Sequence, residues 1–205
     1  MEIALFLRGL VIGFSIAAPV GPIGILCIRR TLADGRMAGL LSGLGAATAD
    51  ALYGCVAGFG LTVVSSFLVD QRAWIQLIGG LFLLLLGVKT LKSRPAENPA
   101  SASGSGLAAS YASTFFLTLT NPMTILAFAG IFAALGVVNT GGDLSAAALL
   151  VLGVFLGSAA WWLILSGGVG LVREKLNPGI LRWVNRLSGV ILVVFGGVAV
   201  WQAAG

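Results

Sequence analysis

The stretch Ala18-Pro19-Val20-Gly21-Pro22-Ile23-Gly24 decides the fold, because it interrupts an apolar run that would otherwise form one continuous helix. Each proline lacks an amide donor and clashes with the carbonyl four residues earlier, so the stretch predicts a break or a kink. In a lipid bilayer a break leaves backbone groups unpaired unless protein, water or a ligand satisfies them. We therefore expect this part of the chain to line a cavity.

The composition is that of a membrane protein. The chain has 205 residues, of which 58% are hydrophobic and 9% are charged, and its mean hydropathy is +1.04. Because a membrane helix needs about 20 apolar residues, the length accommodates roughly six spans in a single membrane domain, residues 1–205. The chain contains no histidine, which is the commonest metal ligand and neutral-pH proton carrier. No cofactor and no metal site are expected.

Six apolar segments follow one another along the chain. They cover residues 3–28, 37–63, 73–91, 107–138, 144–172 and 187–203. Residues 93–106 are rich in Ser, Ala, Gly and Pro, which is typical of a flexible linker between two halves, residues 1–92 and 107–205. The polar stretch 173–186 is predicted to connect the last two segments. The expected fold class is an all-α membrane protein with six transmembrane helices.

The positions of the basic residues predict an orientation. Ten of the 12 Lys and Arg residues lie in the connections between segments one and two, three and four, and five and six. The other side has Arg8 and Arg72 alone. Because cytoplasmic loops are enriched in Lys and Arg, the linker should be cytoplasmic and both termini should lie outside. We interpret the basic residues, Arg29-Arg30 included, as topology signals and headgroup contacts, not as a nucleic-acid surface.

The two halves of the chain resemble each other. Aligning Pro22 with Pro122 pairs the first break with a second one, Thr120-Asn121-Pro122. Further on, Leu44-Gly45-Ala46-Ala47 pairs with Leu156-Gly157-Ser158-Ala159, and Trp74, Gly80 and Gly87 pair with Trp183, Gly189 and Gly196. Two joined units of three spans must cross the membrane in opposite senses. The match therefore predicts an inverted 3+3 repeat with helices one and four broken, an architecture of many secondary transporters. A chance alignment of glycine-rich helices is the alternative.

Asp50 is the one acidic residue well inside an apolar segment. A carboxylate at that depth costs about 2.5–3.5 kcal/mol, so it rarely persists without a partner or a role. The residues that share its helical face are small: Gly43, Ala46, Ala47, Gly54 and Ala57. Such a stripe packs against another helix, so Asp50 should point into the bundle. There it could pair with a substrate ammonium group, take up a proton, or act as a structural carboxylate.

The two breaks could expose helix N-termini, whose free N–H groups and positive dipole end bind carboxylates. Asn121 adds an amide that can both donate and accept hydrogen bonds. A proline kink that only serves packing is the alternative at either break. The predicted substrate and proton site combines both breaks with the embedded acid: Gly21, Pro22, Gly24, Asp50, Thr120, Asn121 and Pro122.

Several of these motifs together resemble the LysE/RhtB amino-acid exporters. The motifs are Gly21-Pro22, Gly35-Arg36-x-x-Gly39-Leu40, Gly43-Leu44-Gly45, Asp50, Gly58-Phe59-Gly60-Leu61 and Asn121-Pro122. The resemblance covers essentially the whole chain and implies six helices and efflux of amino acids across the bacterial inner membrane, driven by the proton-motive force. In many members Asn follows the first Gly-Pro. Ile23 stands here instead, so the site has one polar group fewer.

The leading hypothesis is a transporter, not an enzyme, that exports amino acids or related small zwitterions by proton antiport. A divalent-cation exporter on the same architecture is the runner-up, although hard cations usually need more than one carboxylate. A thiol–disulfide carrier would have to use Cys27 and Cys55, which form no Cys-x-x-Cys motif. A non-transporting scaffold would have no use for the embedded acid. The sequence leaves the substrate, the coupling ion and the oligomeric state, including a homo-oligomer, open.

Overall fold

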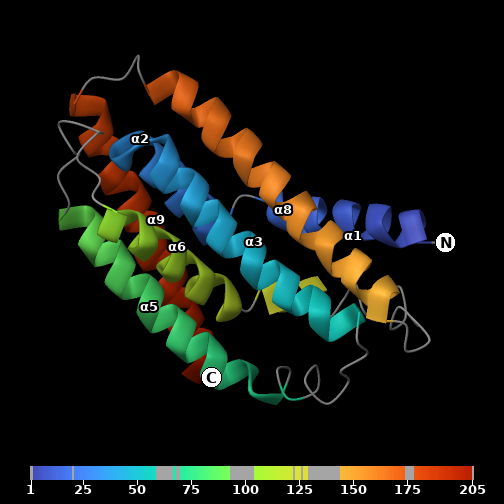
Figure 1. Cartoon of the computed structure of the whole chain (residues 1–205). Coiled ribbons are helices and arrows are strands. Elements are labelled where there is room, and N and C mark those ends of the chain that lie inside the picture. Colours follow the sequence, from blue (N-terminus) through green and yellow to red (C-terminus); the bar gives the residue numbers. More distant parts are fainter. Residues whose placement is uncertain are drawn as a thin grey trace.

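The computed structural model describes residues 2–19, 21–58, 67, 70–92, 104–121, 123–125, 127–128, 144–173 and 178–204. The regular elements in these ranges are all α-helices (Figure 1). In chain order they are α1 (Glu2–Ala17), α2 (Pro22–Asp34), α3 (Arg36–Gly58), α5 (Arg72–Lys92), α6 (Gly104–Leu119), α8 (Leu144–Arg173) and α9 (Pro178–Ala204). The expectation of an all-helical fold is confirmed for this part of the chain. Most of the predicted linker, residues 93–103, lies outside the described residues.

The first apolar segment is two helices, not one. Helix α1 ends at Ala17, α2 begins at Pro22, and their axes differ by 78°. Pro22 occupies the first position of α2, where a missing amide hydrogen costs no helical hydrogen bond. Gly21 precedes it in an extended conformation, with φ −108° and ψ −163°. The predicted break in the first segment is therefore confirmed.

Three other boundaries differ from or refine the sequence prediction. Helix α6 ends at Leu119, directly before the second predicted break, but Pro122 itself lies outside the described residues. The same helix begins at Gly104, inside the stretch expected to be linker. Helix α9 begins at Pro178, so the prediction of a polar connection over 173–186 is wrong. Its first turns are amphipathic, because Asn185 is buried while Arg182 and Arg186 are exposed.

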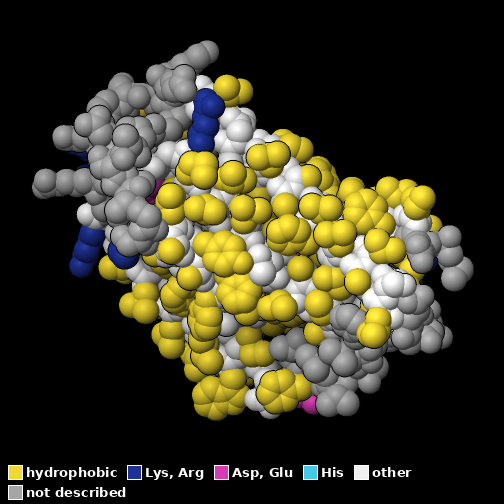
Figure 2. Space-filling model, viewed as in Figure 1, with side chains coloured by type: hydrophobic (Ala, Val, Ile, Leu, Met, Phe, Trp, Pro, Cys, Tyr) yellow, Lys and Arg dark blue, Asp and Glu magenta, His cyan; other side chains and the backbone are white. Residues whose placement is uncertain are grey.

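The helices are suited to a membrane. Three of them are long and apolar enough to cross it, over Ala73–Lys92, Leu144–Leu171 and Arg182–Ala203, and α1 with α2 qualifies as a fourth, bent span. Large apolar side chains cover much of the face in Figure 2, while Lys and Arg side chains gather at one end of it. These features indicate a protein with several membrane spans. Six spans stay a prediction.

Helix α3 lies between α8 and α6, and it also contacts α2 (Figure 1). Helix α1 packs on α8, and α5 packs on α9. These contacts use close backbone approaches at glycines, as in many membrane helix pairs. A methyl group added at Gly157 of α8 would meet Leu10 O and Phe14 N of α1, and one added at Gly45 of α3 would meet Tyr111 O of α6.

The contacts between α5 and α9 come in matching pairs. A methyl group added at Gly87 would lie 2.9 Å from Val193 N and 3.0 Å from Gly189 O. One added at Gly196 would lie 2.8 Å from both Leu84 N and Gly80 O. The two helices thus present equivalent glycines to equivalent backbone atoms of each other, and the region around these glycines is closely packed.

Candidate functional site

A cavity of about 330 Å³ lies where the break between α1 and α2 meets the end of α6. Its walls also include residues of α3, α8 and α9 and of the segment 123–127. Five of the seven residues predicted for the site line this cavity: Gly21, Pro22, Gly24, Asp50 and Asn121. The structure therefore brings the first break and the embedded acid together with Asn121.

The other two predicted site residues are placed differently. Thr120 is not among the residues that line the cavity, and its hydroxyl donates a hydrogen bond to Phe116 O at 2.9 Å. The backbone of Thr120 lies against Gly79 of α5, so this residue faces the packing of the bundle. Pro122 lies outside the described residues.

Asp50 is buried, with 3% of its surface exposed, and it points into the bundle as its small-residue stripe predicted. Ser158 of α8 donates a hydrogen bond to Asp50 Oδ2 at 2.7 Å, and Trp162 Nε1 donates to Ser158 Oγ at 3.1 Å. Gly43, on the same face of α3, lies against the Trp162 side chain. One neutral donor, Ser158, which is itself held by Trp162, thus fixes one carboxylate oxygen, and Asp50 still lines the cavity.

The N-terminus of α2 also opens on the cavity. Ile25 N is the first amide with an intrahelical partner, Gly21 O, at 3.0 Å. The amides of Ile23 and Gly24 come earlier in the first turn, where no helical carbonyl is available. No side chain in the described ranges caps this terminus, and both residues line the cavity. These N–H groups and the helix dipole suit an anion.

Asn121 caps the helical turn that follows the second break. Its Oδ1 accepts a hydrogen bond from Met123 N at 3.3 Å, and its Nδ2 donates to Thr124 Oγ1 at 2.9 Å. The carbonyl of Asn121 accepts from the amides of Thr124 and Ile125 at 3.1 Å each. The side-chain oxygen therefore occupies the position that an anion would take at an uncapped terminus. The two breaks differ in this respect, because the terminus of α2 remains free.

The rest of the cavity wall is mainly apolar. Ile16, Ile23, Trp162 and Phe195 contribute large hydrophobic side chains. Trp162, which also donates to Ser158, thus belongs both to the wall and to the support of Asp50. A cavity with a carboxylate, a free helix N-terminus and hydrophobic walls can hold a small molecule with both charges and an apolar body.

Sequence reasoning missed two residues that hold the site together. Tyr53 Oη donates a hydrogen bond to Leu119 O at 2.7 Å, so it caps a carbonyl at the end of α6. Its ring stacks on Phe128, with centroids 5.2 Å apart. Ser158 holds the carboxylate of Asp50. The available signals were weak: Tyr53 follows Asp50 by one helical turn, and Ser158 is the polar member of a run of small residues.

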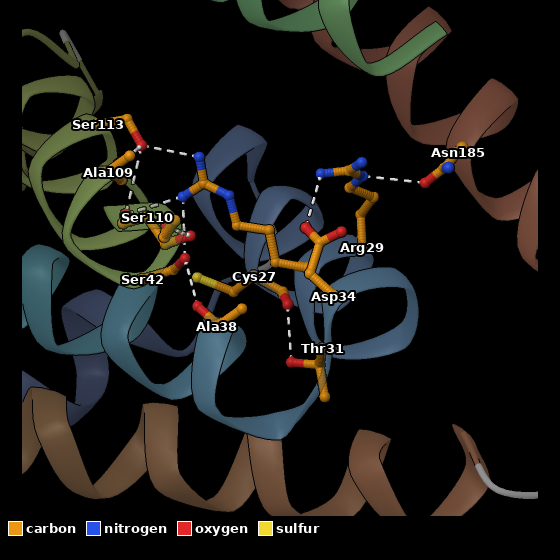
Figure 3. A network of polar contacts seen from close by, with 12 residues as sticks. Cys27, Arg29, Thr31, Asp34, Ala38, Ser42, Ala109, Ser110, Ser113 and Asn185 are labelled. Atoms are coloured by element: carbon orange, nitrogen blue, oxygen red, sulfur yellow. Dashed lines mark hydrogen bonds and ion pairs between the residues drawn. The ribbon is translucent and has the colours of Figure 1, made fainter. Parts of the chain in front are cut away.

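The interpretation of Arg29-Arg30 as headgroup contacts is wrong, because both side chains are buried, with 9% and 7% exposed. Arg29 Nε donates to Asn185 Oδ1 of α9 at 2.9 Å, and its Nη1 pairs with Asp34 at 3.1 Å (Figure 3). Arg30 reaches α3 and α6 instead. A basic pair at the end of an apolar run has the same sequence signature whether it faces lipid headgroups or other helices.

Neither cysteine forms a disulfide. Cys27 is fully buried among apolar residues, and Cys55 is half-buried. Within the described ranges, no group of three or more His, Cys, Asp and Glu side chains could hold a metal ion.

Comparison with known proteins adds independent information. The family model of the LysE type translocators matches residues 14–203. The "Putative amino acid efflux protein YcgF" of Bacillus subtilis (strain 168) is 31% identical over 198 residues, which cover 94% of this chain and 93% of that protein. The "Uncharacterized membrane protein YahN" of Escherichia coli (strain K12) is 29% identical over 174 residues, or 82% of this chain and 76% of that protein. No solved structure matches the chain.

Proposed function

The chain belongs to the family of LysE type translocators, and from this premise we propose that it exports amino acids or related small zwitterions across the bacterial inner membrane. The observation that carries the proposal is the cavity, where Asp50 and the uncapped N-terminus of α2 line one space. A relative that is 31% identical bears the name of an amino acid efflux protein, which supports the substrate class.

The chemistry of the cavity fits a zwitterion. The free amides of Ile23 and Gly24 and the helix dipole receive the carboxylate. Asp50 receives the ammonium group, while Ser158, held by Trp162, donates to one of its carboxylate oxygens. The hydrophobic walls accommodate an apolar body.

Proton antiport follows from the use of one carboxyl group for two cations. Asp50 binds either a proton or the substrate ammonium group, since protonation removes the charge that attracts the ammonium. Exchange of one for the other at opposite faces of the membrane couples export to proton entry. Competition at a single acid is sufficient for this coupling, and Asp50 is the one acid among the described residues that line the cavity.

The packing supports the six-span inverted repeat that we propose as the architecture. The glycines that the sequence alignment pairs, Gly87 with Gly196, approach equivalent backbone atoms on the opposite helix. The pair α1–α8 corresponds to the pair α6–α3 in such a repeat, and both pairs are in contact. The gathering of Lys and Arg at one end of the molecule supports a cytoplasmic linker and outward termini (Figure 2).

The test is a transport screen with the purified protein in lipid vesicles, under an imposed pH gradient. Labelled amino acids and divalent metal ions are offered one at a time. Gly21→Leu tests whether the substrate passes through the cavity. Gly21 is extended at φ −108°, and a methyl group added there meets no atom within 4 Å. This side chain should fill the cavity without strain and abolish transport.

Gly167→Leu is the matched control, because a methyl group added at Gly167, on the exposed surface of α8, also meets no atom within 4 Å. It should transport like the wild type. Transport of a metal ion but no amino acid would refute the substrate class, and equal transport by both leucine variants would refute the route.

A further inference from the structure

Arg30 is a buried guanidinium, and its hydrogen-bond partners in the described part of the chain are all neutral. Its Nη1 donates to Ser42 Oγ at 2.9 Å, to Ser110 O at 2.8 Å and to Thr114 Oγ1 at 2.7 Å. Its Nη2 donates to Ser113 Oγ at 2.7 Å. Through these bonds one side chain of α2 connects the helices α3 and α6.

Arg30 forms no ion pair within the described ranges. Asp34 forms its ion pair with the adjacent Arg29 at 3.1 Å and attracts Arg30 without a direct contact. No carboxylate oxygen in this part of the chain accepts a hydrogen bond from Arg30. A buried charge without a partner of opposite sign is costly, and such residues are usually functional inside membranes. An anion bound beside Arg30 would therefore stabilise its buried positive charge.

The cluster lies one helical turn from the cavity on two helices, α3 and α6. On α3, Asp50 and Ala46 line the cavity, and Ser42 is one turn further along. On α6, Thr118 lines the cavity, and Thr114 is one turn further along. One turn is about 5.4 Å. Both lines of side chains therefore lead from the cavity directly to the guanidinium of Arg30.

The passage along α2 from the cavity to the guanidinium of Arg30 is closed in this conformation. Leu26 and Cys27 lie between Gly24 and Arg30 along α2, and both are fully buried. A molecule that leaves the cavity in this direction must therefore displace α2. That helix is short, and the break at its N-terminus separates it from α1 by 78°, so it can move as a separate body.

We propose that Arg30, with the hydroxyls of Ser42, Ser113 and Thr114, is a second carboxylate-binding station on the transport path. The inference rests on the proposed function and adds where the substrate goes after the cavity. A carboxylate can accept two parallel hydrogen bonds from a guanidinium, whereas in this cluster separate neutral oxygens accept the hydrogen bonds that Arg30 donates. When the substrate takes their place, α2 is released from α3 and α6, so that occupancy of the station opens the path.

The test supplies Arg30 with a permanent internal carboxylate. Ser42→Asp places an acid where the serine oxygen is 2.9 Å from Nη1, and Ser42→Asn is the neutral control of the same size. If the station acts in transport, the Asp variant should melt no lower than the Asn variant in detergent. The export turnover of the Asp variant in vesicles should be at least about tenfold lower than that of the Asn variant, since a charge-assisted pair must then be broken in each cycle.

If Arg30 only ties the helices together, the two variants should transport equally, and that result overturns the station while leaving the proposed function in place. Failure of the wild type to transport any amino acid overturns both. Where Ser42→Asp does not fold, Ser113→Asp and Ser113→Asn decide the question in the same way, because Ser113 Oγ lies 2.7 Å from Nη2 and is less buried.

Discussion

Replacing Asp50 by Asn removes the charge from the proposed site while leaving its packing in place. The asparagine carbonyl can accept the hydrogen bond that Ser158 Oγ donates at 2.7 Å, so the contact between α3 and α8 is retained. Trp162 keeps its bond to Ser158 as well. We therefore expect Asp50→Asn to insert, fold and melt like the wild type.

The size of the functional effect follows from the two roles proposed for this carboxylate. A hydrogen bond between charged groups is worth about 1.5–3 kcal/mol, so loss of the pair with the substrate ammonium should raise the KM for export about 10- to 100-fold. Loss of the proton site removes the coupling. Because one pH unit corresponds to 1.36 kcal/mol, a one-to-one antiporter can sustain about a tenfold concentration ratio per unit of pH gradient. The variant should sustain none.

The assay uses vesicles loaded with the amino acid that the screen identifies. Initial rates over a range of substrate concentrations give the KM, and the final distribution at fixed pH gradients gives the coupling. Asp70→Asn, the same substitution at an exposed position just before α5, is the matched control and should behave like the wild type. An Asp50→Asn protein with unchanged KM and unchanged gradient-driven accumulation would refute both roles and leave Asp50 as a structural carboxylate.

Two further predictions address the supports of the site and the redox alternative. Tyr53→Phe removes the hydrogen bond to Leu119 O but keeps the ring stacked on Phe128, so we expect a loss of about 1 kcal/mol in stability, measured by denaturation in detergent, and slower transport. Unchanged stability together with unchanged transport would show that the end of α6 needs no cap. A cysteine-free variant, Cys27→Ala with Cys55→Ala, should still transport, since both cysteines are free and Cys27 packs among apolar residues. Loss of transport in a folded cysteine-free protein would favour thiol chemistry.

The sequence predicts the break in the first span because proline and glycine act locally. Pro22 cannot continue the preceding helix, whatever surrounds it, and α2 begins at this residue. The burial of Asp50 was predictable for a similar reason, since the small residues on its face allow close packing of a second helix. Its partner was not predictable, because Ser158 is 108 residues away and only the packing of α3 on α8 brings the two together.

The misread parts of the sequence are those in which polar residues have two possible surroundings. The stretch 173–186 contains enough charge to suggest a loop, yet α9 begins within it and turns Asn185 towards α2. Arg30 follows an apolar run like any membrane-boundary arginine, but its partners come from two other helices. Composition along the chain does not distinguish a polar residue in water from one that is satisfied inside the bundle.

Helix α2 contacts α3 closely at Gly39, but hydrogen bonds from two buried arginines also hold it in place, and these bonds suit it to be the moving part in the proposed transport cycle. Helices α5 and α9 meet through backbone approaches at glycines, such as Gly196 against Gly80 O, which leave no room for rearrangement. Helix α2 is connected to α3, α6 and α9 by hydrogen bonds from Arg29 and Arg30. A carboxylate or water can replace such bonds at little net cost, because the exchange puts one hydrogen bond to the guanidinium, worth about 1.5–3 kcal/mol, in place of another. One end of α2 lines the substrate cavity and the other end carries these exchangeable bonds, so a substrate that passes along this helix meets first the site that binds it and then the contacts that hold the path closed.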